Sequence, residues 1–543
     1  IHAPTPDGHG PMNGSGEGSE SQAPGPPGPP RPQTSSRPPG SRQPPASPRP
    51  PGSRRPQTST RLRLALRVAS AFAAVLLALL LAGFVIRSKL PPLSALLLVG
   101  LAVPLWRDGR SVLPLLFLAT PLQFPALRHL SVSLVDAVIV LYLLFAIVRL
   151  LRGAPLNDVV RRPRRVIAIP ALLYLALSLL SGLHSIPWCA GAVRQASPAG
   201  SLIAWAMATF GGAVNPLNLL WRFLASAALL FLLAAHAWEE RSLARLGTSA
   251  LVATAFLGIV AVAERILEPA LGAAELRGLL GTDFPPGRMP ATFSWPTQLA
   301  SYLNLSLPLV WAAVFLGGRH GGEAGGKRRL AWTRRAAPWS ALLGLAAMYL
   351  SMTRGGWAGL FLSLALLGLL AARAGVSRRR LAFIGVLLAL VLVPLSGRLV
   401  GTRVEMKAAE EPGPPRGRMG YVWPAAAAMI RAHPLSGVGL GTWRDVAPAY
   451  APPPAAAVVG ESATERAHAH NVFVHAAAES GIPTALALLA LSAACVCLLF
   501  RRAAARGSSQ AWIWVGPAAA LPGFLAHGLV EHVLFAPGLF FCF

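Results

Sequence analysis

Residues 132–150 read VSLVDAVIVLYLLFAIVRL, an apolar stretch that contains one acidic residue and ends beside one arginine. A helix of about 20 such residues spans the ~30 Å hydrocarbon core of a bilayer. Comparable stretches recur along the chain, at 65–86, 92–106, 111–127, 166–187, 216–236, 248–268, 298–317, 336–353, 355–372, 381–396, 472–500, 511–527 and, in part, 529–543. Together they predict an all-α, polytopic transmembrane helical bundle of about 12–13 spans.

The composition agrees with a membrane protein. Only 13% of the 543 residues are charged, whereas a soluble chain carries about a quarter. The formal net charge of +28 would also be typical of a nucleic-acid-binding protein. The arginines, however, gather in short loops between apolar stretches, as they do in the cytoplasmic loops of membrane proteins. We therefore expect a lipid bilayer as a partner and no nucleic acid.

The first 60 residues differ from the rest of the chain. Residues 1–60 consist largely of Pro, Gly, Ser and Arg, with few bulky apolar residues. Such a segment buries too little apolar surface to offset the entropy lost on ordering. We expect a disordered cytoplasmic tail at 1–60, followed by the transmembrane domain at 61–543.

The arginine-rich loops predict which ends of the spans share a membrane face. They lie at 149–165, 239–245, 319–335, 373–380 and 501–506. An even number of predicted spans separates each loop from the next, so all of them can lie in the cytoplasm. The opposite face then receives 188–215, 269–297, the turn 351–356 and the long loop 397–470.

The long loop, 397–470, is the largest segment outside the membrane after the tail. Loops of more than about 12–15 residues are usually functional or disordered. This one contains an Ala-rich stretch at 419–432 and a Gly-rich stretch at 437–441. We predict a helix in the first and a turn in the second, and therefore an ordered loop.

Two arginines lie on the face that should be poor in arginine. Arg288 precedes the span that begins near residue 298, and Arg354 lies in the short turn between two spans. An arginine at a span end commonly anchors the helix at the membrane interface. A guanidinium also binds phosphate oxygens through paired hydrogen bonds and stays charged at any relevant pH. We predict that Arg288 and Arg354 hold a diphosphate at the membrane surface.

Histidines gather where the long loop re-enters the membrane, in HAHNVFVHAAAES at 468–480. His470 is predicted to be a general base, because imidazole titrates near neutral pH, with Asn471 as its orienting partner. A structural histidine at a helix start is the alternative. His468 and His470 lack a cysteine or acidic partner at ligand spacing, so we expect no metal. Glu479 follows His470 by over two helical turns, about 13 Å, and is expected not to pair with it.

Three more residues of the loop region are candidates for contacting the acceptor or supporting the loop, as are His468 and Glu479. They are Arg418, Trp423 and Trp443. The two tryptophans could stack on sugar rings, and packing within the loop is the alternative.

Four stretches in order resemble the O-antigen ligase and polymerase superfamily. They are R-x-P-x-T-F-x-x-P from Arg288, S-x-T-R-G-G-W from Ser351, RMGYVWPAAAAMIRAHPLSGVGLGTW from Arg418, and HAHNVFVHAAAESGIPTALALL from His468. The resemblance covers about 280–490. The ligase pattern has a further glycine after G-x-x, whereas here Gly481 is followed by Thr484, which leaves the branch of the superfamily open.

The resemblance implies a glycosyltransferase of the bacterial inner membrane, multi-pass, with its active site facing the periplasm. The donor would be a glycan linked to polyprenyl diphosphate, and no cofactor is implied. Arg288 and Arg354 match the arginines that hold the diphosphate, His470 matches the histidine that acts near the acceptor, and Asn471 matches the polar residue beside it. In the ligase branch, the acceptor is a sugar of the lipid A core.

Several alternatives stay open at this point. A polymerase of O-antigen or exopolysaccharide would use another repeat unit as its acceptor, and a protein O-oligosaccharyltransferase would use a protein. Outside enzymes, a transporter could bind an anionic substrate with the same arginines, although such sites usually lie near the bilayer midplane. The expected reaction is an inverting, metal-independent transfer to an acceptor hydroxyl.

Overall fold

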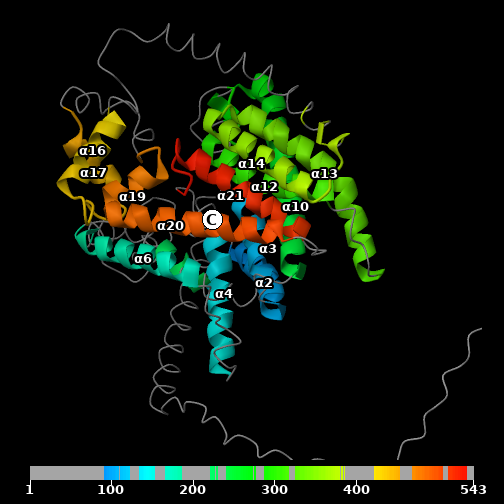
Figure 1. Cartoon of the computed structure of the whole chain (residues 1–543), viewed down its shortest axis with the longest axis horizontal. Coiled ribbons are helices and arrows are strands. Elements are labelled where there is room, and N and C mark those ends of the chain that lie inside the picture. Colours follow the sequence, from blue (N-terminus) through cyan, green and yellow to red (C-terminus); the bar gives the residue numbers. More distant parts are fainter. Residues whose placement is uncertain are drawn as a thin grey trace, which may run out of the picture. The chain divides into compact units, whose positions relative to one another are not determined.

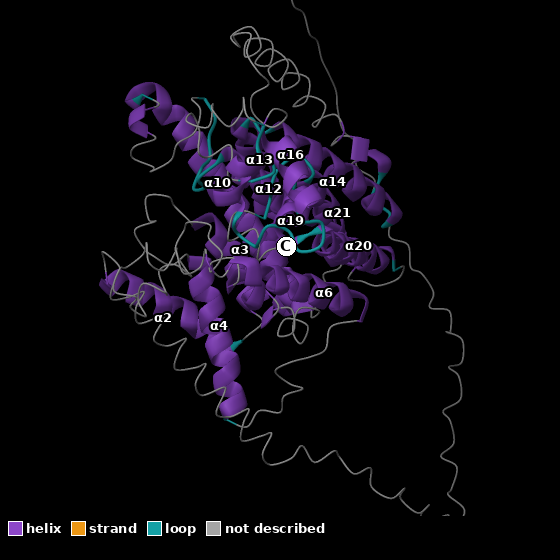
Figure 2. Ribbon diagram, turned by 90° about the vertical axis from the view of Figure 1, so that its left-hand side faces the viewer, coloured by secondary structure: helices purple, strands orange, loops and turns teal. Residues whose placement is uncertain are grey.

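We analysed a computed structural model of the chain, in which all described residues belong to a unit that runs Thr60–Phe543. It describes residues 91–108, 111–122, 134–152, 165–185, 187, 221–226, 228–229, 240–272, 274–276, 287–316, 324–379, 381–382, 385, 421–452, 468–505 and 511–534. These residues form helices and loops, with no strand among them (Figures 1 and 2). The predicted all-α class is confirmed. The predicted tail and Arg418 lie outside the described residues.

Six described helices are long and apolar enough to cross a membrane. They are α4 (Leu134–Leu151), α6 (Arg165–Gly182, continued by the 3-10 turn Leu183–Ser185), α10 (Glu240–Leu271), α12 (Pro296–Leu316), α14 (Arg354–Arg373) and α20 (Ile482–Ala504). Each coincides with a predicted apolar stretch. The predicted total of about 12–13 spans also counts 65–86, which lies outside the described residues, and 381–396, which lies mostly outside them.

The remaining described helices are shorter, more charged or less apolar than these six. They are α2 (Pro91–Arg107), α3 (Val112–Ala119), α13 (Ala324–Ser351), α16 (Trp423–Ala432), α17 (Trp443–Tyr450), α19 (Val472–Ser480) and α21 (Ala511–Gly528). The predicted arginine-rich loops 319–335 and 239–245 are helical where the structure describes them, because residues 324–335 belong to α13 and residues 240–245 belong to α10. Lys, Arg, Leu and Ala all favour helix, so these helices extend through their charged ends.

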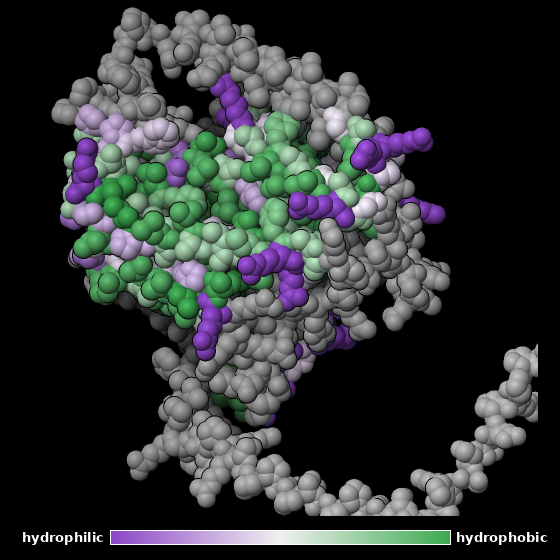
Figure 3. Space-filling view, in the orientation of Figure 1, coloured by the Kyte–Doolittle hydropathy of each residue, from purple (hydrophilic) through white to green (hydrophobic). Residues whose placement is uncertain are grey.

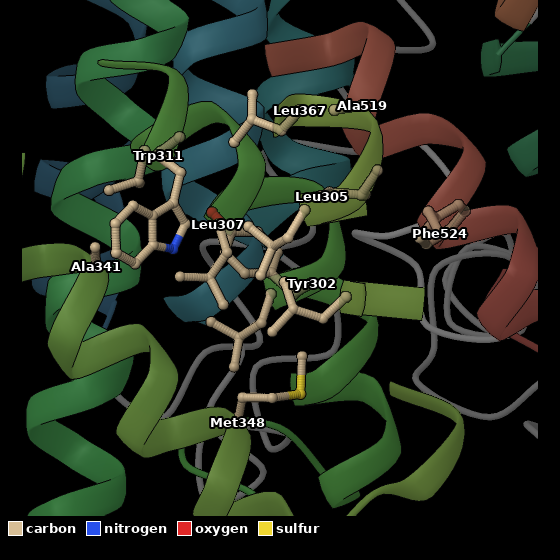
Figure 4. Close-up of a cluster of buried hydrophobic side chains, with 14 of the residues drawn as sticks. Tyr302, Leu305, Leu307, Trp311, Ala341, Met348, Leu367, Ala519 and Phe524 are labelled. Carbon is tan, nitrogen blue, oxygen red and sulfur yellow. The ribbon is translucent and has the colours of Figure 1, made fainter. Parts of the chain in front are cut away.

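The main core lies between α10, α12, α13, α14 and α21. Helix α12 is the most enclosed of the candidate spans, because 83% of its most apolar 18-residue segment is buried inside the protein. Its Trp311 lies beside Ala341 of α13 in the cluster that Figure 4 shows, and the hydroxyl of its Tyr302 donates to the carbonyl oxygen of Phe117 in α3 at 2.8 Å. On the outside, apolar side chains such as Leu172 and Leu486 are exposed, and Figure 3 shows a broad hydrophobic surface, as expected for helices that face lipid.

Helices α14 and α21 cross at small residues. A Cβ added to Gly523 would collide with the hydroxyl of Ser363 and the carbonyl oxygen of Gly359. Such close approach of backbones is the usual way in which helices associate in membranes, where polar and van der Waals contacts replace the hydrophobic effect. The crossing positions Arg354, because Arg354 is the first residue of α14.

Gly523→Ala should therefore lower the free energy of unfolding by about 1–3 kcal/mol, the usual cost of overpacking. Gly368→Ala is the matched control in α14, since an added Cβ there meets nothing within 4 Å. The control should leave the melting temperature unchanged or raise it. Thermal unfolding of the purified protein in detergent compares the two, and equal melting temperatures would contradict close packing at Gly523.

The predicted span 472–500 is two helices. Gly481 separates α19 from α20 with φ +88°, a conformation that favours glycine. A Cβ at this position would collide with the carbonyl oxygen of Leu435, and the N–H of Ile482 donates to the carbonyl oxygen of Pro434 at 2.8 Å. The break lets the loop containing Pro434 pack directly against the membrane helix.

The described part of the long loop has a core of its own. Helices α16, α17 and α19 pack through Tyr421, Met429 and Trp443, among others, and they lie together above α20 in Figure 1. The predicted helix at 419–432 and turn at 437–441 are confirmed as α16 and a turn with positive φ at Gly437, Gly439 and Gly441.

Contacts between helix ends agree with the two predicted faces. On the predicted cytoplasmic side, Arg245 pairs with Asp108, and Arg149 donates to the carbonyl oxygen of Trp106. On the other side, the hydroxyl of Ser181 donates to the carbonyl oxygen of Glu479 at 2.8 Å. The residues predicted to share a face therefore do meet. The assignment of one face to the periplasm stays a prediction.

Candidate functional site

The first part of the site joins Arg288 to the turn before α14. The Nε of Arg288 donates to the carbonyl oxygen of Ser351 at 3.2 Å, and a terminal nitrogen reaches the hydroxyl of Thr353 at 3.4 Å. In addition, the N–H of Met289 donates to the carbonyl oxygen of Leu350. The two arginine-bearing segments, which are far apart in sequence, thus form one structure.

The two arginines differ in exposure. Arg288 is partly buried, whereas Arg354 is exposed at the start of α14. Burial lowers the pKa of Arg288, the negative charge of Glu531 raises it, and the charge of Arg354 lowers it further. Thr353 precedes α14 without capping it through its side chain. The N–H groups of the first turn and both guanidiniums therefore form a positive region suited to an anion.

The second part of the site joins the histidines to a residue near the end of the chain. His468 Nε2 and His470 Nδ1 both lie 2.8 Å from the same carboxylate oxygen of Glu531, Oε1. An ionised carboxylate only accepts hydrogen bonds, so both nitrogens carry the proton. In the neutral form of His470, the lone pair is then on Nε2, as a general base requires.

The charge state of this cluster follows from its surroundings. Burial raises the pKa of Glu531, but hydrogen bonds from His468 and His470, and their charges, bring it well below its ordinary value. Burial lowers the pKa of His468 to about 4, against the hydrogen bond to Glu531. Burial likewise lowers the pKa of His532. The arrangement is an ionised carboxylate that accepts a hydrogen bond from each of the two imidazoles.

Asn471 does not contact His470 in the way predicted. Its side-chain oxygen accepts from the N–H groups of Phe473 and Val474 at 2.9 and 3.0 Å, which caps α19. Its amide nitrogen donates to the carbonyl oxygen of Leu529 at 2.9 Å. The orienting contact that we predicted for Asn471 is made instead by Glu531, while Asn471 ties α19 to the end of α21.

Glu479 supports the loop. Its two carboxylate oxygens accept from the N–H groups of Gly441 and Trp443 at 2.9 and 2.8 Å, and His475 lies 3.4 Å away. The Gly-rich turn and the start of α17 are therefore built around this carboxylate.

The two tryptophans of the loop have different surroundings. Trp443 is 1% exposed and contacts the ring of His475, so the stacking on sugar that was predicted as possible is excluded here by burial. Trp423 is 43% exposed, and its indole N–H donates to the carbonyl oxygen of Ala469 at 3.3 Å. A sugar ring could stack on Trp423 next to His470.

A metal ion has three candidate ligands here. The ligand atoms of His468, His470 and Glu531 lie within 4.8 Å of one another, so the acidic partner missing from the sequence pattern is supplied by Glu531. Ligands around tetrahedral zinc lie roughly 3.3 Å apart, given bonds of about 2.0–2.1 Å. The 2.8 Å contacts are shorter and fit shared protons better than a shared ion.

Backbone strain marks the same three segments. Among the described residues, the non-glycine residues with positive φ are Ala291, Met352 and His470, at 52°, 50° and 50°. They lie next to or within the segments of Arg288, Arg354 and His470. Each such residue costs about 1–3 kcal/mol, and strain of this kind concentrates at functional sites.

The predicted residues are thus brought together at one end of the bundle. Arg288 interacts electrostatically with both Arg354 and Glu531, and Glu531 accepts a hydrogen bond from His470. Glu531 itself was not predicted. Its signal was an acidic residue in the last apolar stretch, and ionisable residues in such stretches are functional candidates.

The described helices and this polar site at one end of them define a multi-pass helical membrane protein. Residues 339–489 match the family described as O-antigen ligase, which supports the resemblance seen in the sequence. The matched stretch contains Arg354, Trp423 and His470, whereas Arg288 and Glu531 lie outside it. No curated protein matches the chain.

Proposed function

We propose that this protein is a membrane glycosyltransferase that moves a glycan from a polyprenyl diphosphate to an acceptor hydroxyl at the periplasmic face. The observation that supports this most is the convergence of Arg288, Arg354 and a Glu531-bound His470 at one end of the bundle. A phosphate-binding group and a general base are the two parts that such a transfer requires.

In the proposed reaction, the two arginines bind the diphosphate of the donor. As the bond between the anomeric carbon and the diphosphate oxygen breaks, negative charge grows on the leaving diphosphate. Fixed guanidiniums and the N–H groups of the first turn of α14 stabilise this charge more than they stabilise the ground state. Arg288 also holds the turn that carries Arg354, so it acts partly by positioning.

In the proposed reaction, His470 acts on the acceptor. Its Nε2 accepts the proton of the attacking hydroxyl, and Glu531 stabilises the imidazolium that forms. The hydroxyl attacks from the side opposite the diphosphate, which inverts the anomeric configuration. Trp423, exposed beside the histidine, provides a surface on which a sugar ring can stack.

The acceptor class has three candidates, with the lipid A core sugar first. A polymerase would instead extend another repeat unit, and a protein O-oligosaccharyltransferase would modify a protein. In a deletion strain, loss of all long glycan from the lipid core, with lipid-linked polymer accumulating, supports the ligase. Single-repeat glycan on the core supports the polymerase.

The purified protein in nanodiscs should transfer glycan from a polyprenyl-diphosphate donor to lipid A core in the presence of EDTA. The reason is that two arginines supply the positive charge, and the His–Glu cluster is held by hydrogen bonds rather than at the spacing of metal ligands. The measurement is the rate of product formation with EDTA, compared with added Mg²⁺ or Zn²⁺. A strict requirement for a divalent cation would contradict this mechanism.

A further inference from the structure

Two carboxylates of α10 bind the segment that carries Arg288. Glu264 accepts a hydrogen bond from the N–H of Ala291 at 2.9 Å. Glu268 accepts one from the N–H of Gly287 at 2.8 Å. Residues four positions apart lie on the same face of a helix. The two carboxylates therefore bind the backbone on either side of Arg288.

Both of the bound backbone positions have positive φ. The angle is +76° at Gly287 and +52° at Ala291. Glycine adopts such a conformation freely, but an alanine in it is strained and persists only when its surroundings hold it there. Ala291 is also buried, so its N–H would be unfavourable without an acceptor. The carboxylate of Glu264 supplies that acceptor and thereby stabilises the conformation of the segment.

Glu264 is an unusual residue for a candidate membrane span. It is 3% exposed and lies within the apolar helix 245–271. Burying a carboxylate in such a helix is costly, and ionisable residues retained there usually serve function. Its second oxygen, Oε1, is buried and makes no hydrogen bond to any residue that the structure describes. Within the described part of the chain, the Glu264 carboxylate thus binds the backbone of the Arg288 segment.

The other side of this segment binds the turn before α14. The N–H of Met289 donates to the carbonyl oxygen of Leu350 at 2.9 Å. The side chain of Arg288 donates to the carbonyl oxygen of Ser351 at 3.2 Å. Hydrogen bonds therefore connect α10, through the segment, to the start of α14, where Arg354 is the first residue. A shift of the segment would displace both arginines of the diphosphate site.

We infer that Glu264 is a positioning residue for the diphosphate site, that it acts through Arg288, and that Glu268 supports the same segment. The inference rests on the proposed glycosyl transfer. Groups that stabilise developing charge are effective because they are held in place before the reaction, and a small displacement of such a group weakens its effect strongly. Glu264 acts here as an acceptor for a backbone N–H, so an amide oxygen at the same place can replace the carboxylate.

Binding of a polyprenyl diphosphate without glycan, measured on the full chain in nanodiscs, tests this role. Glu264→Ala should weaken binding about tenfold, the effect of losing one hydrogen bond to a charged group. Glu264→Gln should retain most of the affinity. The double variant Glu264→Ala/Arg288→Ala should bind no more weakly than Arg288→Ala alone, because residues that act through one another are not additive. The control is Glu275→Ala, which removes an exposed carboxylate and should bind as wild type does.

Two further measurements separate positioning from folding. Hydrogen exchange in the peptide 287–293 should accelerate in Glu264→Ala and stay slow in Glu264→Gln, because only the first variant removes the acceptor of the Ala291 N–H. Glu268→Ala releases the other end of the segment and should weaken binding in the same Arg288-dependent way. This variant keeps the inference testable if Glu264→Ala does not fold, since wild-type binding in Glu268→Ala would refute positioning by these carboxylates.

The outcomes distinguish this inference from the proposed function. Wild-type binding or unchanged hydrogen exchange in Glu264→Ala refutes the positioning role. A loss of affinity that multiplies with the loss in Arg288→Ala also refutes it, because general destabilisation has that result. If Arg288→Ala itself binds as wild type does, the diphosphate site of the proposed function is wrong, and the positioning role falls with it. If binding depends on both residues but no glycan is transferred, the proposed function fails and the positioning role stands.

Discussion

Arg354→Ala should lower kcat for glycan transfer by about 10²–10³-fold, the usual effect of removing one preorganised group that stabilises developing charge. Arg354 is exposed at the first position of α14, so its loss should change folding little. Because its interaction strengthens as the diphosphate leaves, kcat should fall more than the affinity for the donor. Steady-state kinetics at varied donor concentration measures both.

The control for this variant is Arg373→Ala, at the other end of the same helix. Arg373 is exposed and lies on the predicted cytoplasmic side, so its replacement should leave transfer unchanged. Arg354→Lys should retain part of the rate, because an ammonium keeps the charge but not the paired hydrogen bonds. Wild-type kcat in Arg354→Ala would remove Arg354 from the diphosphate site.

Arg288 contrasts with Arg354 in a way that only the structure shows. From sequence, both were equivalent arginines on the arginine-poor face. In the structure, Arg288 donates to the carbonyl oxygen of Ser351 and thereby fixes the turn before α14. Periodicity and charge bias locate a residue along the chain, but they do not tell which side chain binds backbone and which reaches solvent.

Helices were the most predictable feature. The apolar stretches 298–317 and 355–372 differ from α12 and α14 by at most two residues at either end, because about 20 apolar residues leave few alternatives to a spanning helix. The break at Gly481 was not predicted, since hydropathy continues across it. It depends on a tertiary contact, the approach of Leu435 to the backbone of Gly481.

Only those features of the site that depend on nearby residues in the sequence could be predicted. His470 at a loop-to-helix junction was predicted correctly, and α19 begins at Val472. Its partner, Glu531, lies 61 positions later, and no spacing rule joins residues across the intervening helices. Asn471 was the nearest polar neighbour in sequence, but a residue that caps a helix has its side chain committed to backbone N–H groups.

Glu531→Gln should lower kcat by about 10²–10⁴-fold, the range of general acid–base catalysis. The amide has nearly the same shape as the carboxylate, but it has one donor and one acceptor end, so it no longer fixes Nε2 of His470 as the lone-pair nitrogen. It also leaves an imidazolium without its counter-charge. Glu275→Gln is the control, because Glu275 is an exposed carboxylate outside the cluster.

The pH profile separates a positioning role from a purely structural one. If Glu531 stabilises the protonated histidine, its loss makes that histidine harder to protonate, so the acid limb of kcat/KM should move to lower pH. A Glu531 that only anchors the loop before α19 would lower kcat/KM by the same factor at every pH and reduce the melting temperature. An unshifted acid limb together with a lower melting temperature would therefore assign Glu531 to the scaffold and leave His470 without an orienting carboxylate.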